Sequence, residues 1–234
     1  MRSDGMTLSE RIDVVSAQVA DGIILGTEAR DMLVGFLLDR QKGRGRHAGL
    51  MTLWPGEFER GVRLFSGERL RTRRAAENVL TLEAVRLLAM LAGDRADVRD
   101  AMKRSSAVMA RACFAASHCI LGECAHASIA YMRSAASDRS GDLRRWIARH
   151  VQVIRAQRDG AGRWTRFPFY YTLLGLLEVG TPAARAELDY ARCACERASM
   201  RAASEVYVAR RQRIVRRVLE RGENVSSGPC GRPV

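Results

Sequence analysis

Apolar residues recur at helical spacing along almost the whole chain. Near the N-terminus the apolar positions fall three or four residues apart, at Leu8, Ile12, Val15 and Val19. This spacing places them on one face of an amphipathic helix. Thr7 and Glu10 have the spacing of a capping box at its start. No stretch of the chain shows the two-residue alternation of a β-strand, so the pattern predicts an all-α protein.

The apolar periodicity and the turn residues predict nine or ten helices. They cover approximately residues 8–22, 27–38, 58–65, 80–91, 101–120, 124–136, 143–158, 169–177, 183–197 and 202–221. Thr181 followed by Pro182 is a typical helix start, with the threonine as N-cap and the proline at the first position. Short turns between the helices predict stacked helical hairpins. We expect one domain over residues 1–222 and a disordered tail over residues 223–234.

The composition adds a strong positive charge to this picture. The formal net charge is +13, and it is carried almost entirely by arginine. A nucleic acid, an anionic membrane surface or an acidic ligand would each complement it, although arginine also fills solvated helix faces in basic proteins. Two basic segments stand out, one over residues 69–74 and one on the last predicted helix, at Arg210, Arg211, Arg213, Arg216, Arg217 and Arg221.

The hydropathy profile favours a cytoplasmic protein. The N-terminus lacks the apolar core of a signal peptide. The longest uncharged apolar runs, such as residues 112–122, reach about half the length of a membrane span. In a reducing compartment the six cysteines would be core residues or metal ligands rather than disulfides.

Two stretches of the chain echo each other, residues 36–47 and residues 153–172. Each has an apolar helix end, a glutamine (Gln41 or Gln157), a glycine turn, and then a ring (His47 or Trp164). They resemble the QW-type repeat of the terpenoid cyclase and protein prenyltransferase superfamily. The resemblance implies a toroid-like α/α barrel, or an open arc of hairpins, that offers a pocket.

The chain departs from that superfamily in several places. His47 occupies the position where tryptophan is usual, and the second copy carries one extra residue after Gln157. Neither the DxDD acid motif of the cyclases nor the Asp-x-Cys zinc motif of the prenyltransferases is present. The resemblance therefore carries no catalytic residue over to this chain.

Cysteine and histidine gather between residues 113 and 132, which indicates a zinc site. The candidate ligands are Cys119, Cys124, His126 and His118, with Cys113 nearby. Because Cys124 and His126 would lie about 200° apart on one helix, their convergence needs a corner, which Gly122 could provide. Glu123 is the candidate general base beside the metal. The alternatives are a thiolate–imidazole pair of Cys124 and His126, or cysteines that only pack in a core.

The aromatic focus of the chain follows the second glycine turn. Its candidate ligand-binding residues are Trp164, Phe167, Tyr170, Tyr171, Arg163 and Arg166. Such a segment can line a pocket or stack on a ligand. It can equally form a hairpin turn and an inner helix that packs on its neighbours.

Three functions follow from these patterns. The first is a binding or scaffold protein of helical hairpins, with a pocket for a small-molecule or protein ligand. The second is a zinc-dependent enzyme that uses Cys119, Cys124 and His126, with Glu123 as acid or base. The third is a helical-repeat protein that binds nucleic acid through its arginines. Enzymatic and non-enzymatic functions therefore both stay open.

Overall fold

The computed structural model describes residues 5–45, 47–92, 94–138, 143–199 and 205–222. Within these ranges the chain folds into eleven helices and one two-stranded sheet, which confirms the predicted all-α class. The elements are α1 (Leu8–Ala20), α2 (Thr27–Asp39), β1 (Val62–Arg63), β2 (Arg69–Leu70), α3 (Arg73–Ala92), α4 (Ala96–Met109), α5 (Cys113–Ala116), α6 (Cys124–Ser137), α7 (Arg144–Arg155), α8 (Phe169–Val179), α9 (Pro182–Tyr190), α10 (Arg192–Ser199) and α11 (Val206–Gly222). The tail expected over residues 223–234 lies outside the described residues.

The helix starts predicted from the caps Thr7 and Thr181 are confirmed, whereas Thr27, expected to cap the second helix, is its first residue and follows the N-cap Gly26. At α1 the Thr7 hydroxyl accepts a hydrogen bond from the Glu10 amide at 3.1 Å, and the Glu10 carboxylate accepts one from the Thr7 amide at 2.7 Å. At α9 the Thr181 hydroxyl accepts from the Ala184 amide at 3.3 Å. These bonds satisfy amide groups that the first turn of a helix leaves without partners.

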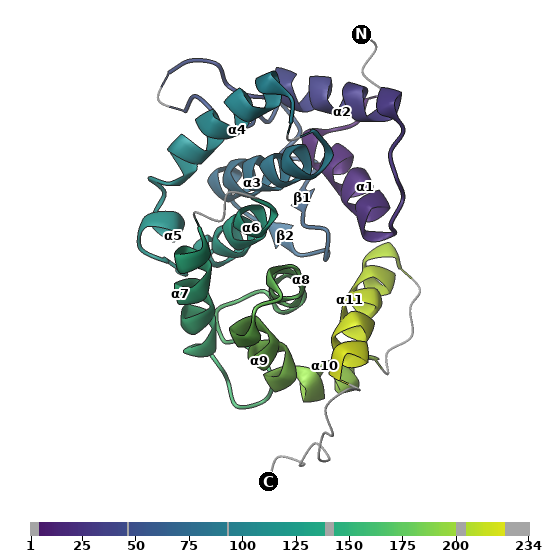
Figure 1. Ribbon diagram of the computed structural model, residues 1–234, viewed down its shortest axis with the longest axis vertical. Helices are drawn as coiled ribbons and strands as arrows, with labels where there is room; N and C mark the ends of the chain where they lie inside the picture. The colour runs from purple at the N-terminus through teal and green to yellow at the C-terminus, as the bar shows by residue number, and fades with distance from the viewer. Residues whose placement is uncertain (1–4, 46, 93, 139–142, 200–204, 223–234) are drawn as a thin grey trace.

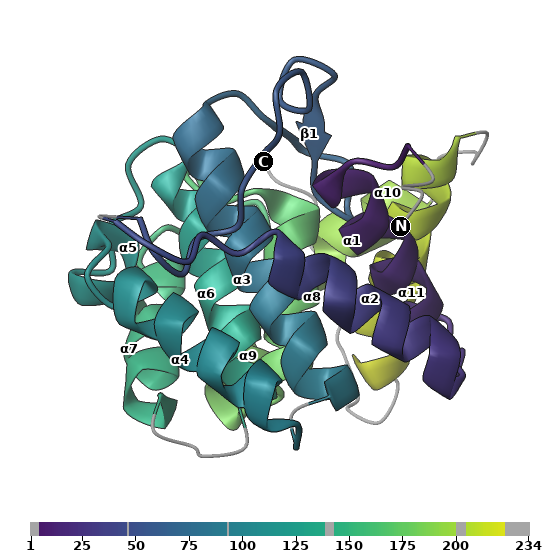
Figure 2. The same cartoon turned by 90° about the horizontal axis from the view of Figure 1, so that it is seen from above.

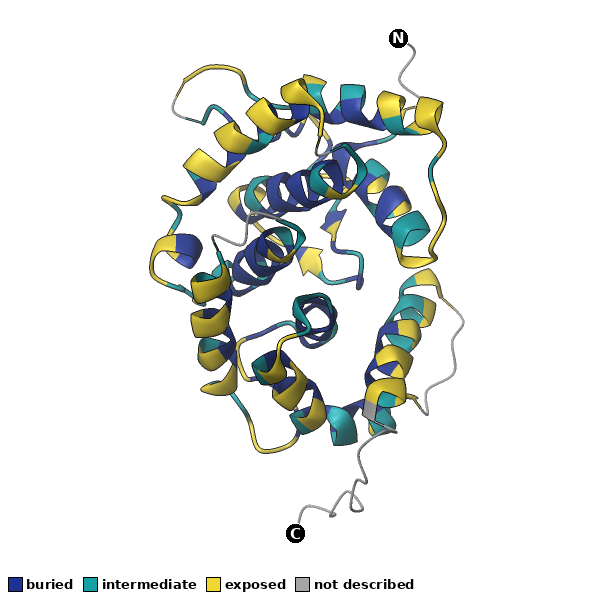
Figure 3. Cartoon of the chain, viewed as in Figure 1, coloured by how far each residue is buried: buried dark blue, intermediate teal, exposed yellow. Residues whose placement is uncertain are grey.

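Three helices form the interior of the molecule: α3, α6 and α8 lie side by side in the middle (Figure 1). Figure 3 shows them mostly buried, whereas α2, α4, α7, α9 and α11 surround them with an exposed outer face. The sequence explains α8, because nearly all its side chains are apolar and a helix that is apolar all round is buried. Gly175 allows α8 to approach α6 closely, since a Cβ there would lie 2.8 Å from Met132 Cε.

The expected helix over residues 58–65 is wrong. In its place β1 and β2 pair antiparallel, Val62 with Leu70 and Arg63 with Arg69, and Figure 2 shows this hairpin projecting at one edge of the molecule. Gly61 and Gly67 have positive φ angles of 93° and 88°. These angles end any helix and form the turns of the hairpin, which is too short to show an alternating pattern.

The single helix expected over residues 101–120 is also wrong. It is divided into α4, which ends at Met109, and the short helix α5, which begins at Cys113. Ala112 between them is extended, with φ −73° and ψ 145°. The break allows Phe114 to bury against the edge of Tyr131 on α6, at a ring-centroid distance of 6.1 Å. It also sets the orientation of Cys113, which directly follows Ala112.

A buried ionic network ties the three central helices together. Arg133 of α6 bonds Glu83 of α3 through Nη1, and its Nε donates to Glu178 of α8 at 2.8 Å. Arg86 donates to the same Glu178 at 2.7 Å, and the Tyr171 hydroxyl donates to Glu83. Arg133 is 2% exposed, so it lies in the core with both carboxylates as counter-ions.

Each of the two glutamine turns closes with a β-bridge. In the first, Gln41 pairs with Met51, and its side-chain amide donates to Ala101 O of α4 at 2.8 Å. In the second, Arg158 pairs with Trp164, whose buried indole donates to Glu187 of α9 at 3.1 Å. The first turn is therefore attached to α4 by its glutamine, and the second turn is attached to α9 by its tryptophan ring.

None of the helices described here combines the length and the hydropathy needed to cross a membrane.

Candidate metal centre

Three cysteine side chains converge where α5 passes into α6. Cys113 is the first residue of α5, Cys124 is the first residue of α6, and Cys119 lies in the connection between them. All three sulfur atoms lie within 4.8 Å of one another, and the Sγ atoms of Cys113 and Cys124 are 3.5 Å apart. Cys113 is exposed and the other two are half-buried, so the cluster lies at the surface.

The connection folds back because two of its residues adopt the left-handed conformation. Gly122 has φ 54°, which costs glycine nothing, but His118 has φ 53°, which is unfavourable for a residue with a Cβ. The Cys119 amide donates to Cys113 O at 3.3 Å across the resulting turn. The reversal brings Cys119 beside both helix starts.

A stack of three rings holds the strained His118 in place. Its ring stacks on Trp146 of α7 at 4.8 Å, and Trp146 stacks on His150 at 4.6 Å. The Nδ1 atoms of His118 and His150 are 3.2 Å apart, and the Trp146 indole donates to Ala115 O of α5 at 2.6 Å. The connection that carries Cys119 is thus anchored to α7.

The two half-buried thiols, Cys119 and Cys124, differ in acidity because their surroundings differ. The Leu121 amide, and then the neighbouring Cys113 and Cys124 thiols, hydrogen bond to Cys119 and lower its pKa. Burial, followed by the two neighbouring cysteines, raises the pKa of Cys124 to about 12. Cys119 therefore forms a thiolate more readily than Cys124, whose proton a bound metal ion would have to displace.

The three sulfur atoms lie close enough together to hold one metal ion. Zn–S bonds of about 2.3 Å in a tetrahedron place the sulfurs about 3.8 Å apart, close to the 3.5 Å between Cys113 and Cys124. A disulfide would need about 2.05 Å, so these two thiols are separate. Three protein ligands leave a fourth coordination position, and the exposure of Cys113 would make it accessible to water.

Two of the four predicted ligands belong to this group, and two lie outside it. Cys119 and Cys124 face each other across the corner at Gly122, as the sequence predicts, and Cys113 joins them. His118 is turned toward His150 instead. His126 lines a separate cleft of about 940 Å³, where its Nδ1 is buried with no hydrogen-bond partner among the described residues and burial lowers its pKa.

The carboxylate of Glu123, the candidate general base, caps the N-terminal end of α3. It accepts hydrogen bonds from the amides of Arg71 and Thr72, at 2.6 and 2.8 Å, and from the Thr72 hydroxyl at 2.6 Å. These groups precede α3, where the positive end of the helix dipole favours a carboxylate. The geometry gives Glu123 a positioning role between α6 and α3.

The aromatic segment belongs mainly to the core. Trp164, Phe167 and Tyr171 are buried, and Tyr171 is held by Glu83. Tyr170 is partly buried under the guanidinium of Arg211, 5.0 Å from its ring centroid. The exposed Arg163 lies over Phe169 at 4.4 Å, and Arg166 is exposed. This arrangement is that of an inner helix packed on its neighbours.

Several arginines of α11 are bound within the molecule. Arg210 pairs with Asp13 of α1 at 2.6 Å, Arg211 donates to Ser66 O at 2.7 Å, and Arg213 pairs with Asp21. They fix α11 to α1 and to the β-hairpin. The exposed arginines of this helix that remain are Arg216, Arg217 and Arg221.

Comparisons with known protein families, with curated proteins and with solved structures find no match for this chain.

Proposed function

We propose that the protein binds one thiophilic metal ion of the zinc class through Cys113, Cys119 and Cys124. The observation that carries the proposal is the convergence of three sulfur atoms within 4.8 Å at the start of two helices. Soft thiolate ligands select zinc over magnesium or calcium. The bound ion would link α5 to α6 and supply a Lewis acid with one exchangeable position.

The surroundings of the cluster support a binding protein more than a zinc hydrolase. A hydrolase needs a free base near the metal, but the Glu123 carboxylate already accepts three hydrogen bonds at the start of α3. The intramolecular bonds of Arg210, Arg211 and Arg213 likewise favour a packing role for the first half of α11 over contact with nucleic acid.

We also infer that the helices follow an open arc of α/α hairpins, the arrangement that the glutamine turns imply. In sequence order each central helix is followed by a peripheral one: α3 by α4, α6 by α7 and α8 by α9. The metal site would lie at the junction between the first and second of these hairpins. In this arrangement the ion fixes how one hairpin stacks on the next.

Metal content of protein purified under reducing conditions, without an affinity tag, tests the proposal. We expect about one zinc per chain, which Co²⁺ can replace with intense thiolate charge-transfer absorption. Cys119→Ser and Cys124→Ser should each abolish this absorption. Cys195→Ala is the matched control, because Cys195 is a buried thiol outside the cluster.

Two results would overturn the metal proposal. One is that the parent protein binds neither zinc nor cobalt, while the cysteine variants show the same helical circular dichroism as the parent. The other is a Cys113–Cys124 disulfide, detected by mass spectrometry of protein prepared in the reducing buffer, because it would assign the cluster to redox chemistry.

A further inference from the structure

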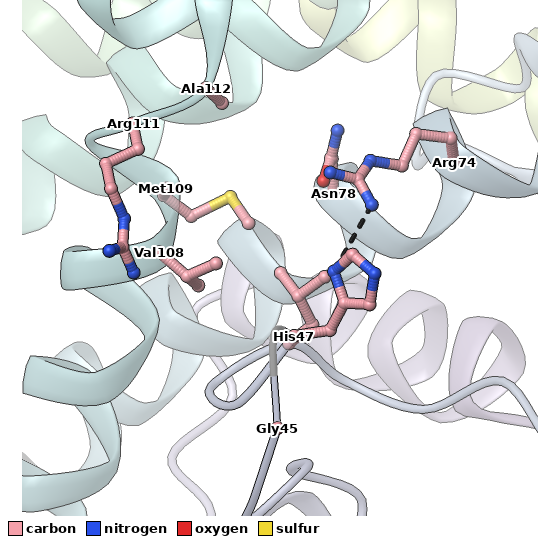
Figure 4. Close-up of a pocket in the computed structure, with 9 residues that line it drawn as sticks. Gly45, His47, Arg74, Asn78, Val108, Met109, Arg111 and Ala112 are labelled. Carbon is pink, nitrogen blue, oxygen red and sulfur yellow. Dashed lines mark hydrogen bonds between the residues drawn. The ribbon is translucent and has the colours of Figure 1, made fainter.

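A second pocket, of about 560 Å³, lies between three parts of the chain: the loop that follows α2, the first turns of α3, and the end of α4 (Figure 4). Three segments far apart in the sequence meet there. Its lining residues are Gly45, His47, Leu50, Arg74, Asn78, Val108, Met109, Arg111 and Ala112. The volume is within the range of pockets that hold small organic ligands.

The pocket is positively charged, and among the residues that the structure describes its lining contains no acidic one. Arg74 and Arg111 lie on opposite sides of it in Figure 4. Arg111 has no hydrogen bond or ion pair within the described part of the chain, and the contact found for Arg74 is with His47. By contrast, Arg40, Arg133 and Arg210 are each paired with a carboxylate. Two guanidinium groups without counter-ions at one cavity favour an anionic ligand.

The contact between Arg74 and His47 determines which imidazole nitrogen can donate to a ligand. Arg74 Nη1 lies 3.4 Å from His47 Nδ1, and a guanidinium can only donate. His47 Nδ1 is therefore the acceptor, and the ring proton lies on Nε2. With the Asn78 amide, the pocket offers hydrogen-bond donors of three chemical kinds.

The rest of the lining is apolar. Val108 and Ala112 contribute partly exposed aliphatic surface beside the charged groups, whereas Leu50 and Met109 are buried behind it, and Figure 4 shows Val108 and Met109 between Arg111 and His47. A free inorganic anion would leave this surface in contact with water. The pocket thus matches a ligand with an anionic group and a small apolar body.

We propose that this pocket binds a phosphate monoester of a small organic molecule. The phosphate would lie between Arg74 and Arg111, and the organic part would cover Val108 and Ala112. A phosphate dianion matches two guanidinium charges, whereas one carboxylate would leave one of them unneutralised. The proposal does not depend on a metal ion, since no cysteine lines the pocket.

Titration calorimetry with phenyl phosphate tests the proposal. We expect Arg74→Gln and Arg111→Gln each to weaken binding by about tenfold, the effect of losing one charge-assisted hydrogen bond. Arg216→Gln is the matched control, because Arg216 is an exposed arginine on α11 and should leave the affinity unchanged. Benzoate and inorganic phosphate should bind at least about tenfold more weakly than phenyl phosphate.

Three results would overturn the proposal. The first is phenyl phosphate affinity that both arginine variants leave unchanged while their thermal melting matches the parent chain. The second is inorganic phosphate binding as tightly as phenyl phosphate, which would remove the role of the apolar wall. The third is a uridine oligonucleotide that binds through Arg74 and Arg111 when phenyl phosphate does not, which would assign the pocket to nucleic acid.

Discussion

The carboxylate of Glu123 accepts hydrogen bonds from both the amide and the hydroxyl of Thr72, at 2.8 and 2.6 Å. The two residues are 51 positions apart in the sequence. Thr72 Oγ1 in turn accepts from the Ala75 amide at 3.3 Å, so both residues satisfy the open end of α3. Because Cys124 follows Glu123 directly, this contact fixes one side of the cysteine cluster to the central helix.

We expect Glu123→Gln to lower the free energy of unfolding by about 1–2 kcal/mol. The substitution replaces a charged acceptor of three hydrogen bonds at a helix N-terminus with a neutral one. Urea unfolding followed by circular dichroism measures the change. Glu220→Gln removes the same charge from an exposed position of α11, so it controls for the net charge of +13. Equal stability of the two variants would contradict a capping role for Glu123.

Breaking the buried ionic network should cost much more. Arg133→Met would remove one of the two arginines that pair with Glu83 and Glu178 in the core and leave both carboxylates to Arg86, and we expect a loss of about 3–5 kcal/mol. Arg213→Met is the control: it breaks the pair with Asp21, whose members are 47% and 38% exposed, and should cost less than about 1 kcal/mol. Similar losses in the two variants would show that the network contributes no more than a surface pair.

His150 should make the stability fall as the pH falls. Burial, and then the neighbouring His118, lowers the pKa of His150 to about 3, against about 6.5 in the unfolded chain. Between these values the unfolded chain binds the proton and the folded chain does not, so acid favours unfolding. At pH 5 the contribution is about 2 kcal/mol less than at pH 7.5.

A variant that removes only this group isolates the effect. The difference in unfolding free energy between pH 7.5 and pH 5 should be smaller by about 2 kcal/mol in His150→Gln than in the parent chain, because the variant lacks the imidazole whose pKa burial lowers. Urea unfolding at the two pH values measures it. A His150 ring that titrates near 6.5 in NMR of the folded protein would contradict the prediction.

The sequence predicts the helical class because the apolar positions of most helices form regular stripes, and it predicts α1 and α9 from their caps. It does not predict the β-hairpin, whose strands have two residues each and are held by glycine turns. The buried network is also missed. From the sequence alone, charged residues such as Glu83, Arg86 and Arg133 are expected to be exposed to solvent. Their burial is explained only by their partners on other helices.

The candidate site is predicted in part for a similar reason. Gly122 marks a corner, so the convergence of Cys119 and Cys124 can be foreseen from local rules. Cys113 joins them because the chain leaves helical geometry at Ala112, which no glycine or proline announces. The left-handed His118 is stabilised by rings on α7, and contacts of that kind cannot be read from spacing along one segment.

The ring stack leads to a prediction that joins the fold to the proposed metal centre. Trp146→Phe would keep an aromatic ring in the stack but remove the hydrogen bond from the indole to Ala115 O. Helix α5, which begins with Cys113 and leads into the connection carrying Cys119, would then lose one of its attachments to α7. We expect Co²⁺ to bind with unchanged stoichiometry and about tenfold lower affinity, as for other losses of groups that orient metal ligands.

Trp164→Phe is the matched control for this change. Trp164 is buried and Trp146 partly buried, and each indole donates one hydrogen bond, but Trp164 bonds to Glu187 and packs on α9 and Phe169 rather than on α5 and His118. Both variants should lose stability, whereas Trp146→Phe alone should weaken cobalt binding in a competition titration with a chromophoric chelator. Equal cobalt affinity in the two variants would contradict an anchoring role for Trp146, and the strained His118 would then have to hold Cys119 without it.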